Sequence, residues 1–272
     1  MYARRYKKNL KVYTMALVFS LLWLPSQAGG DSVRRAADCY IVTGYGVGYS
    51  VFCDQGTSPL VYRGPSAAAS LGFEADWTLW RMSVDVDFVG GTYINRFQKK
   101  LNFNNIGGAL GLNAGVMRRV VQSGRWSLWG GVELADIAGL RNNPNLNNSS
   151  TTFDNFALLN LCGRAEYTVG RWRFHAEADV SPLAFSFRPG YAFIDNHSAT
   201  NEANNLLLEN YKWQVGTFDF ISTDIGVSLE LKGGNLLGLN YLWAMLTTGA
   251  NSDNRLVEAA HLLVFSFNFK LN

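Results

Sequence analysis

The sequence has few of the residues that stabilise small secreted domains. Of its 272 residues, only three are cysteines, namely Cys39, Cys53 and Cys162. An odd number at these spacings indicates neither a disulfide framework nor a metal site. Cys39 and Cys53 flank one candidate strand, which would hold them too far apart to bridge. We therefore expect three unpaired cysteines and no metal or other cofactor.

Charged residues are also scarce. They make up 17% of the chain, whereas soluble domains usually contain about 25%. The formal net charge of +3 comes from the N-terminus, where five of the 24 basic residues lie (Arg4, Arg5, Lys7, Lys8 and Lys11). Without these five, 19 basic and 21 acidic residues remain, a formal charge of −2. This balance predicts no nucleic-acid partner.

The sequence has no apolar run long enough for a transmembrane helix. The basic N-terminal residues precede an apolar stretch, Val12 to Leu24, and small residues suited to cleavage follow up to Ala28. About 13 apolar residues fall short of the roughly 20 that a spanning helix needs. We predict a secretory signal peptide over 1–28, a short lead-in over 29–39, and one domain over 40–272.

From residue 40 onward, apolar and polar side chains alternate. In the stretch from Val169 to Asp179, Trp172 and Phe174 fall on one face of a strand, whereas Arg173 and His175 fall on the other. Similar stretches begin near residues 40, 66, 81, 105, 125, 153, 217, 235 and 256. The pattern predicts ten strands of roughly 13 to 17 residues, much longer than the usual strand of about 5–6.

The predicted connections alternate between tight and long. Those near Trp80, Ser123, Gly170 and Gly233 are tight, and those at 54–65, 95–104, 141–152, 188–216 and 249–255 are longer and polar. This asymmetry is typical of a closed antiparallel transmembrane β-barrel, although a soluble β-sandwich or soluble barrel is the alternative. Four tryptophans beside the tight turns predict an aromatic girdle at a membrane interface: Trp77, Trp80, Trp126 and Trp172.

From about residue 40 to its end, the chain resembles the small bacterial outer-membrane β-barrel proteins. The resemblance lies in the architecture and not in a diagnostic motif. It implies export by the signal peptide to the outer membrane of a Gram-negative envelope, with short periplasmic turns and longer extracellular loops. It also implies contact with outer-membrane lipid and lipopolysaccharide.

The polar faces of the predicted strands would then line the lumen. Unpaired charges there are costly, so we expect these side chains to interlock as a structural network. The ionisable residues at these positions are Glu74, Asp76, Asp85, Asp87, Glu133, Arg164, Glu166, Arg173, His175, Glu177, Asp179, Asp224, Glu230 and Lys270.

Ten strands is also the number in the omptin outer-membrane proteases, which combine an aspartate pair with a His–Asp pair across the barrel. Asp85 and Asp87, with His175 and either Glu177 or Asp179, resemble that set, and His175 would act as general base. Omptin sites lie at the outer rim, however, and these residues are only a few positions from the tight turns. We therefore assign no catalytic residue and interpret the chain as a non-enzymatic barrel.

Two further roles remain open. A slim path between the lumen side chains would make the barrel a narrow ion or solute channel, because a lumen of this size is too small for a wide pore. Alternatively, the loop over 188–216 could contact a surface ligand or a protein partner through its aromatic residues, Tyr191, Phe193, Tyr211 and Trp213.

Overall fold

The computed structural model describes residues 37–97, 105–144, 151–187, 211–215, 220–248 and 255–271. The signal peptide predicted over 1–28 and most of the lead-in lie outside these residues. The strands are β1 (Asp38–Asp54), β2 (Ser58–Asp76), β3 (Trp80–Thr92), β4 (Ile106–Ser123), β5 (Trp126–Asn142), β6 (Thr151–Val169), β7 (Trp172–Phe187), β8 (Tyr211–Val215), β9 (Phe220–Glu230), β10 (Leu236–Thr248) and β11 (Leu256–Lys270). No helix among the described residues is long and apolar enough to cross a membrane.

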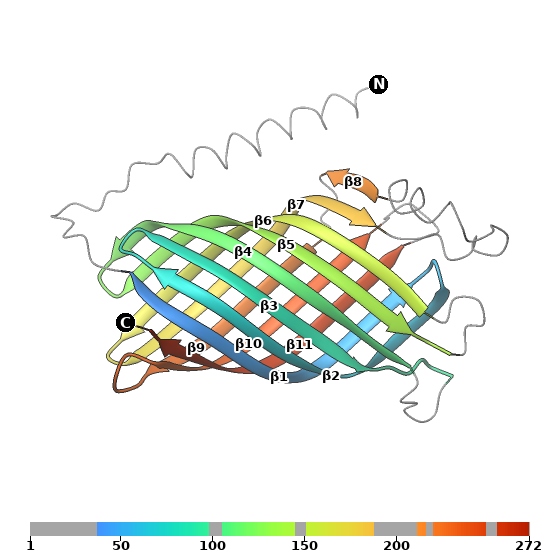
Figure 1. Cartoon of the computed structure of the whole chain (residues 1–272), viewed down its shortest axis with the longest axis horizontal. Helices are drawn as coiled ribbons and strands as arrows, with labels where there is room; N and C mark the ends of the chain where they lie inside the picture. Colours follow the sequence, from blue (N-terminus) through green and yellow to red (C-terminus); the bar gives the residue numbers. More distant parts are fainter. Residues whose placement is uncertain are drawn as a thin grey trace, which may run out of the picture.

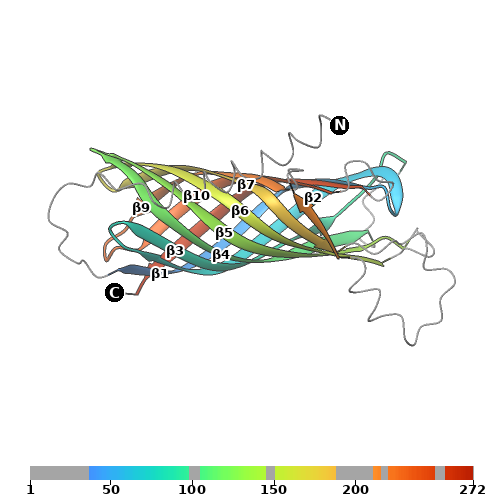
Figure 2. The ribbon, with the colours of Figure 1, turned by 90° about the horizontal axis from the view of Figure 1, so that it is seen from above.

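Ten of the strands form one closed antiparallel barrel. Each pairs with its neighbour in the chain, β7 pairs with β9, and β1 pairs with β11 along almost its whole length. The short strand β8 pairs only with the last residues of β7. Figures 1 and 2 show the strands strongly tilted around a common axis. The predicted ten-stranded barrel is confirmed, and a single closed sheet excludes the two-sheet sandwich.

The alternation in the sequence separates an apolar outer surface from a lumen. Val47 and Leu134 on the outer face are 68% and 64% exposed, whereas the inward Tyr40 and Ala135 are buried. Successive side chains of a strand point to opposite sides of the sheet, so every strand contributes to both surfaces. The apolar exterior is that of a barrel in contact with lipid.

Four tight turns lie at one end of the barrel. Gly124, Gly170, Gly233 and Gly234 have positive φ angles there, between 57° and 92°, and glycine adopts such angles without steric cost. The turn between β2 and β3 is closed by a hydrogen bond from Trp77 N to the Trp80 carbonyl oxygen. We call this the short-turn end and the other the long-loop end; strand β11 ends at the short-turn end, where Figure 1 marks the C-terminus.

Two predicted loops are shorter in the structure. The segment predicted as a loop over 54–65 is mostly strand, because β2 already begins at Ser58. Asp54 accepts a hydrogen bond from Gly56 N at 3.1 Å, which closes a tight turn of three residues. The segment predicted as a loop over 188–216 contains β8 at its end.

A β-bulge reorients the last part of β7. Leu159 pairs with Leu183 and Leu161 with Val180, so Asn160 lies opposite both Ser181 and Pro182. Proline has no amide hydrogen to donate, and a bulge is one of the few positions in a sheet that tolerates it. Beyond the bulge the inward positions shift from odd to even residue numbers, so that Ala184 and Ser186 face inward and are buried.

Candidate functional site in the barrel lumen

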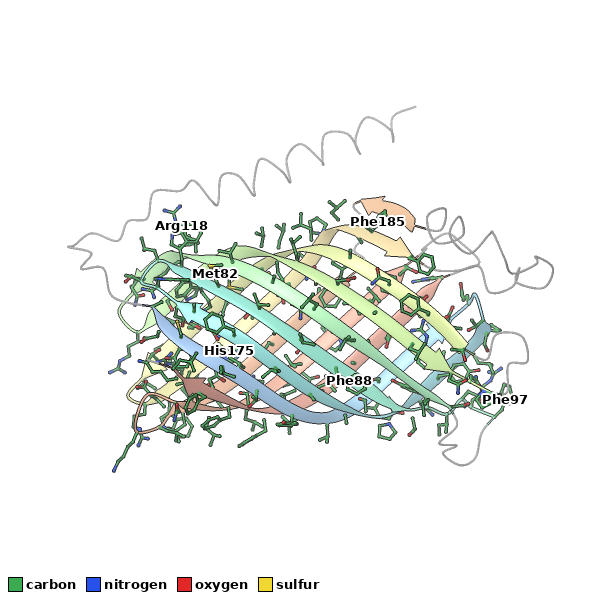
Figure 3. All side chains as sticks on the ribbon, in the orientation of Figure 1. Met82, Phe88, Phe97, Arg118, His175 and Phe185 are labelled. Atoms are coloured by element: carbon green, nitrogen blue, oxygen red, sulfur yellow. The ribbon has the colours of Figure 1, made fainter. Side chains whose placement is uncertain are left out.

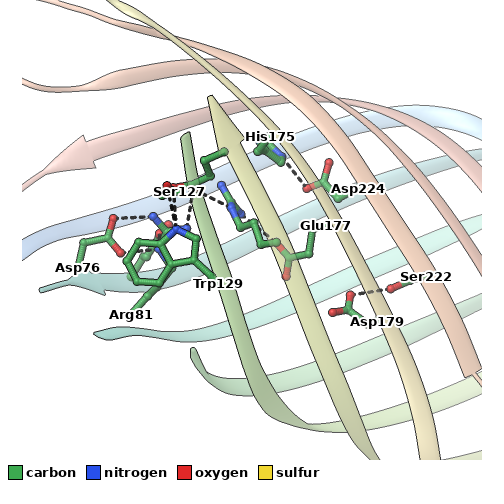
Figure 4. A network of polar contacts seen from close by, with 12 residues as sticks. Asp76, Arg81, Ser127, Trp129, His175, Glu177, Asp179, Ser222 and Asp224 are labelled. Atoms are coloured by element: carbon green, nitrogen blue, oxygen red, sulfur yellow. Dashed lines mark hydrogen bonds and ion pairs between the residues drawn. The ribbon is translucent and has the colours of Figure 1, made fainter. Parts of the chain in front are cut away.

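The lumen near the short-turn end is held together by a cluster of ion pairs around two arginines, which we call the arginine cluster. The guanidinium of Arg81 contacts the carboxylates of Glu74 at 2.9 Å, Asp76 at 2.5 Å and Glu166 at 2.7 Å. Arg164 contacts Glu166 at 2.8 Å and Glu177 at 2.9 Å. These contacts connect strands β2, β3, β6 and β7 across the lumen (Figure 4).

An inward-facing tryptophan completes this cluster. The indole nitrogen of Trp129 donates to Glu166 Oε2 at 3.0 Å. Its ring lies 4.8 Å from the guanidinium of Arg81 and 4.5 Å from that of Arg119. A cation over an indole face is a favourable contact, and more so where water is excluded. Trp129 is therefore part of the lumen and not of the outer aromatic girdle.

Four carboxylates beyond the arginine cluster form the acidic belt: Asp85, Asp87, Glu133 and Asp179. The amide nitrogen of Asn113 donates to both Asp85 and Asp87, at 2.6 and 2.8 Å. Asn160 donates to Glu133 at 2.9 Å, and Ser222 donates to Asp179 at 2.8 Å. The hydrogen-bond donors to the belt are therefore neutral groups.

His175 lies beside the acidic belt, in the half of the barrel near the short turns (Figure 3). Its Nε2 atom is 3.3 Å from Asp224 Oδ2 on β9. Gly226, which pairs with His175 across the two strands, leaves room for the imidazole, because a Cβ there would lie 2.5 Å from its Cε1 atom.

A cavity of about 260 Å³ lies among these side chains. It is lined by members of the arginine cluster, by Asp85, Asp87 and Glu133 of the acidic belt, and by His175 and Asp224. The lining also reaches Asp76 and Leu236, which stand at the short-turn ends of β2 and β10.

Toward the long-loop end, part of the lumen is lined by a cluster of apolar side chains. The buried residues of this apolar layer come from β5, β6, β7, β10 and β11: Ala135, Phe156, Leu158, Ala184, Leu246 and Leu256. Phe156 is 2% exposed and Leu256 is fully buried. These side chains of the barrel wall pack against one another inside the lumen, on the side formed by β5, β6, β7, β10 and β11.

A second cluster of charges lies beside the apolar layer, since Asp54 pairs with Leu256 and Glu258 pairs with Leu246. The guanidinium of Arg141 binds Asp154 directly, contacts Glu258 at 3.2 Å and approaches Asp54 at 3.5 Å. It also lies 5.5 Å from the ring of Phe52. This cluster joins β1, β5, β6 and β11 at the long-loop end.

Eleven of the fourteen predicted lumen residues line the cavity, and Asp179, Glu230 and Lys270 each lie two positions from a lining residue on the same face of their strands. Nine belong to the arginine cluster or the acidic belt, and His175 pairs with Asp224. The remaining three lie near the short-turn rim, where Arg173 contacts Glu230 at 3.3 Å and Lys270 contacts Asp38 at 2.7 Å.

The sequence analysis missed Arg81, Trp129, Arg141 and the apolar layer. The alternation of the strands could have identified both arginines, because residues an even number of positions apart point to the same face. Arg81 shares a face with Asp85 and Asp87 in this way, and Arg141 shares one with Glu133. Both were overlooked because they stand at the ends of predicted strands.

The histidine–carboxylate pair differs from the one suggested by the omptin resemblance. His175 contacts Asp224, whereas Glu177 binds Arg164 and Asp179 accepts from Ser222. Since Glu177 and Asp179 are engaged elsewhere, the structure does not form the predicted pairing.

The aromatic residues singled out in the sequence lie at opposite ends of the barrel. Trp77, Trp80, Trp126 and Trp172 are exposed on the outer face beside the short turns. In the loop, Tyr211 and Trp213 belong to β8, where they pair with Phe187 and Phe185 of β7. Tyr191 and Phe193 lie outside the described residues.

Comparison with known proteins relates the chain to outer-membrane barrels through its structure. No family model and no curated protein matches the sequence. The outer-membrane protease OmpT from Escherichia coli is similar with a TM-score of 0.52 and 5% identity, over 90% of this chain and 100% of OmpT. The translocator domain of the autotransporter NalP from Neisseria meningitidis gives 0.40 and 9%, over 98% of both chains. Neisserial surface protein A gives 0.38 and 8%, over 85% of this chain and 97% of that one.

At these identities the likeness concerns the fold alone. Together with the closed sheet and its apolar exterior, it defines the chain as a small β-barrel of the bacterial outer-membrane type.

Proposed function

We propose that the chain is a closed, non-enzymatic barrel of the bacterial outer membrane, with a structural or surface-contact role. Its short-turn end would face the periplasm. The exposed tryptophans at that end support this orientation, because indole side chains favour the headgroup region of a bilayer. The longer connections at the other end would then face the outside, where lipopolysaccharide, a surface ligand or a protein partner could bind.

The observation that carries the proposal is the filled lumen. The arginine cluster spans it near the short-turn end, and the apolar layer occupies it toward the long-loop end. An ion crossing the barrel would have to pass the buried Phe156 and Leu256, where it would lose part of its hydration, and the ion pairs that Arg141 forms at the same end. This arrangement favours a closed barrel over the narrow channel.

Planar-bilayer recording tests the proposal directly. We expect the purified barrel, inserted into lipid, to show no steady conductance above that of the bare bilayer. Flotation of proteoliposomes made from the same preparation would establish that the protein is in the membrane. A reproducible unitary conductance of the unmodified protein would contradict the closed lumen and favour the narrow ion channel.

A further inference from the structure

The lumen cavity carries more negative charge than its own cations balance. Eight carboxylates line it, against three arginines and His175. Two of these arginines, Arg81 and Arg164, are already surrounded by carboxylates of the arginine cluster. Asp85, Asp87 and Glu133 instead accept hydrogen bonds from the neutral amides of Asn113 and Asn160. Carboxylates in a poorly solvated interior are stabilised by a cation or a proton.

Independent of this charge, several buried polar atoms lack hydrogen-bond partners among the described residues. The side chain of His175 is only 7% exposed, and its Nε2 atom, although near Asp224, forms no hydrogen bond. Asp224 Oδ1 and Asn240 Oδ1, which belong to the same cavity lining, receive none either. The Oδ1 atom of the fully buried Asn160, which lies beside Glu133, also accepts no hydrogen bond from the described residues. Unpaired buried acceptors are costly, so this set suits a ligand that brings several N–H donors.

The spacing of these groups suits a polyatomic cation better than a metal ion. No group of three or more His, Cys, Asp or Glu side chains in the described part of the chain could hold a metal. Calcium and magnesium require several oxygen atoms within about 2.0–2.6 Å of one point. The acceptors here are distributed around a cavity of about 260 Å³.

We propose that this cavity binds a small aliphatic polyamine. One ammonium group would bind at Asp85, Asp87 and Glu133, and a second at Asp224 and His175. An ammonium group has three donors and no acceptor, which matches a lining rich in acceptors. The ligand would enter from the short-turn end, because the cavity reaches the ends of β2 and β10 there and the apolar layer fills the opposite side.

Isothermal titration calorimetry of the whole chain in detergent tests this proposal, with 1,4-diaminobutane as the probe. We expect saturable binding of the diamine and no binding of 1,4-butanediol, which has the same length without the charges. Asp87→Asn and Asp224→Asn should each weaken diamine binding at least about tenfold, since each removes a charge-assisted hydrogen bond. Circular dichroism would confirm that both variants are folded.

Asp136→Asn is the matched control, because Asp136 is exposed on the outer face and accepts from Asn155 at 2.7 Å. Its affinity for the diamine should equal that of the unmodified protein. Absence of saturable binding would overturn the proposal, and so would equal binding of the diol or of magnesium chloride. If Asp136→Asn lost as much affinity for the diamine as the two cavity variants, the binding would reflect attraction to the charged surface and not to the cavity. A closed lumen that binds no diamine would leave the proposed function intact.

Discussion

At the scale of single residues, Arg81 joins two neighbouring strands and the opposite wall within the lumen network. Its side chain is 9% exposed and contacts three carboxylates within 2.9 Å. Its guanidinium also lies over the ring of Trp129. Removing one partner of a buried ion pair leaves the other charge uncompensated, which costs more than the pair itself contributes. The barrel should therefore depend on this arginine more than on any exposed one.

Arg81→Met tests this dependence. We expect the substitution to lower the free energy of unfolding by about 3–5 kcal/mol, because Glu74, Asp76 and Glu166 lose their shared cation. Urea unfolding of the barrel in detergent, followed by tryptophan fluorescence, would measure it. Arg125→Met is the control, since Arg125 is exposed in the turn between β4 and β5. A similar loss in both variants would show that the cluster contributes little.

At the scale of the strands, the contact between β1 and β11 closes the barrel. Gly48 lies in this contact, and a Cβ atom there would overlap the backbone carbonyl oxygen of His261 and lie 2.8 Å from Leu262 Cδ2. The two strands can approach this closely only because residue 48 has no side chain. A β-strand glycine thus marks a site of close backbone approach.

Gly48→Ala should destabilise the barrel by about 1–3 kcal/mol, the usual cost of overpacking. Gly163→Ala is the matched control on β6, because a Cβ at that position meets nothing within 4 Å. We expect the control to change the unfolding free energy by no more than about 0.5 kcal/mol. Urea unfolding of the two variants side by side checks this, and equal effects would refute the steric explanation.

The strands and their faces could be predicted because lipid and lumen impose opposite demands on alternate residues. Where one face is apolar and the other charged, as in the middle of β3 and the first half of β7, the sequence identifies the inward residues correctly. The prediction fails where both faces are apolar. Phe156 and Leu158 point inward while Leu159 points outward, so the run over 156–159 conceals the apolar layer.

Other features depend on contacts that sequence patterns do not show. The turn of residues 55–57 is closed by Asp54, yet a segment rich in glycine and proline was expected to be a loop. The bulge at Pro182 shifts which residues of β7 face inward, and only the pairing with β6 shows where it lies. The partner of His175 comes from β9, a strand far along the chain, so Asp224 could not be chosen over nearer carboxylates.

At the scale of the whole molecule, the apolar layer should be what keeps the barrel closed. Phe156→Ala combined with Leu256→Ala removes its two most buried large side chains. We expect this double variant to show stepwise conductance in planar bilayers, because water can enter the widened segment and continue into the cavity beneath.

Leu263→Ala combined with Phe265→Ala is the control, since both side chains are exposed on the outer face of β11. It removes the same two residue types without widening the lumen, and its conductance should stay at background. If the control conducts as well as the lumen variant, the current reflects a loosened barrel and not an opened layer.

The six residues of the apolar layer all lie on strands of the barrel wall. These strands are hydrogen-bonded into the closed sheet, so the layer is not a separate segment that could move away as a unit. If the layer closes the lumen as we propose, the space beneath it would exchange solutes with one side of the membrane only. A solute that enters the cavity would then leave through the same opening. The contents of the cavity would follow those of one compartment, and the two compartments would stay unconnected.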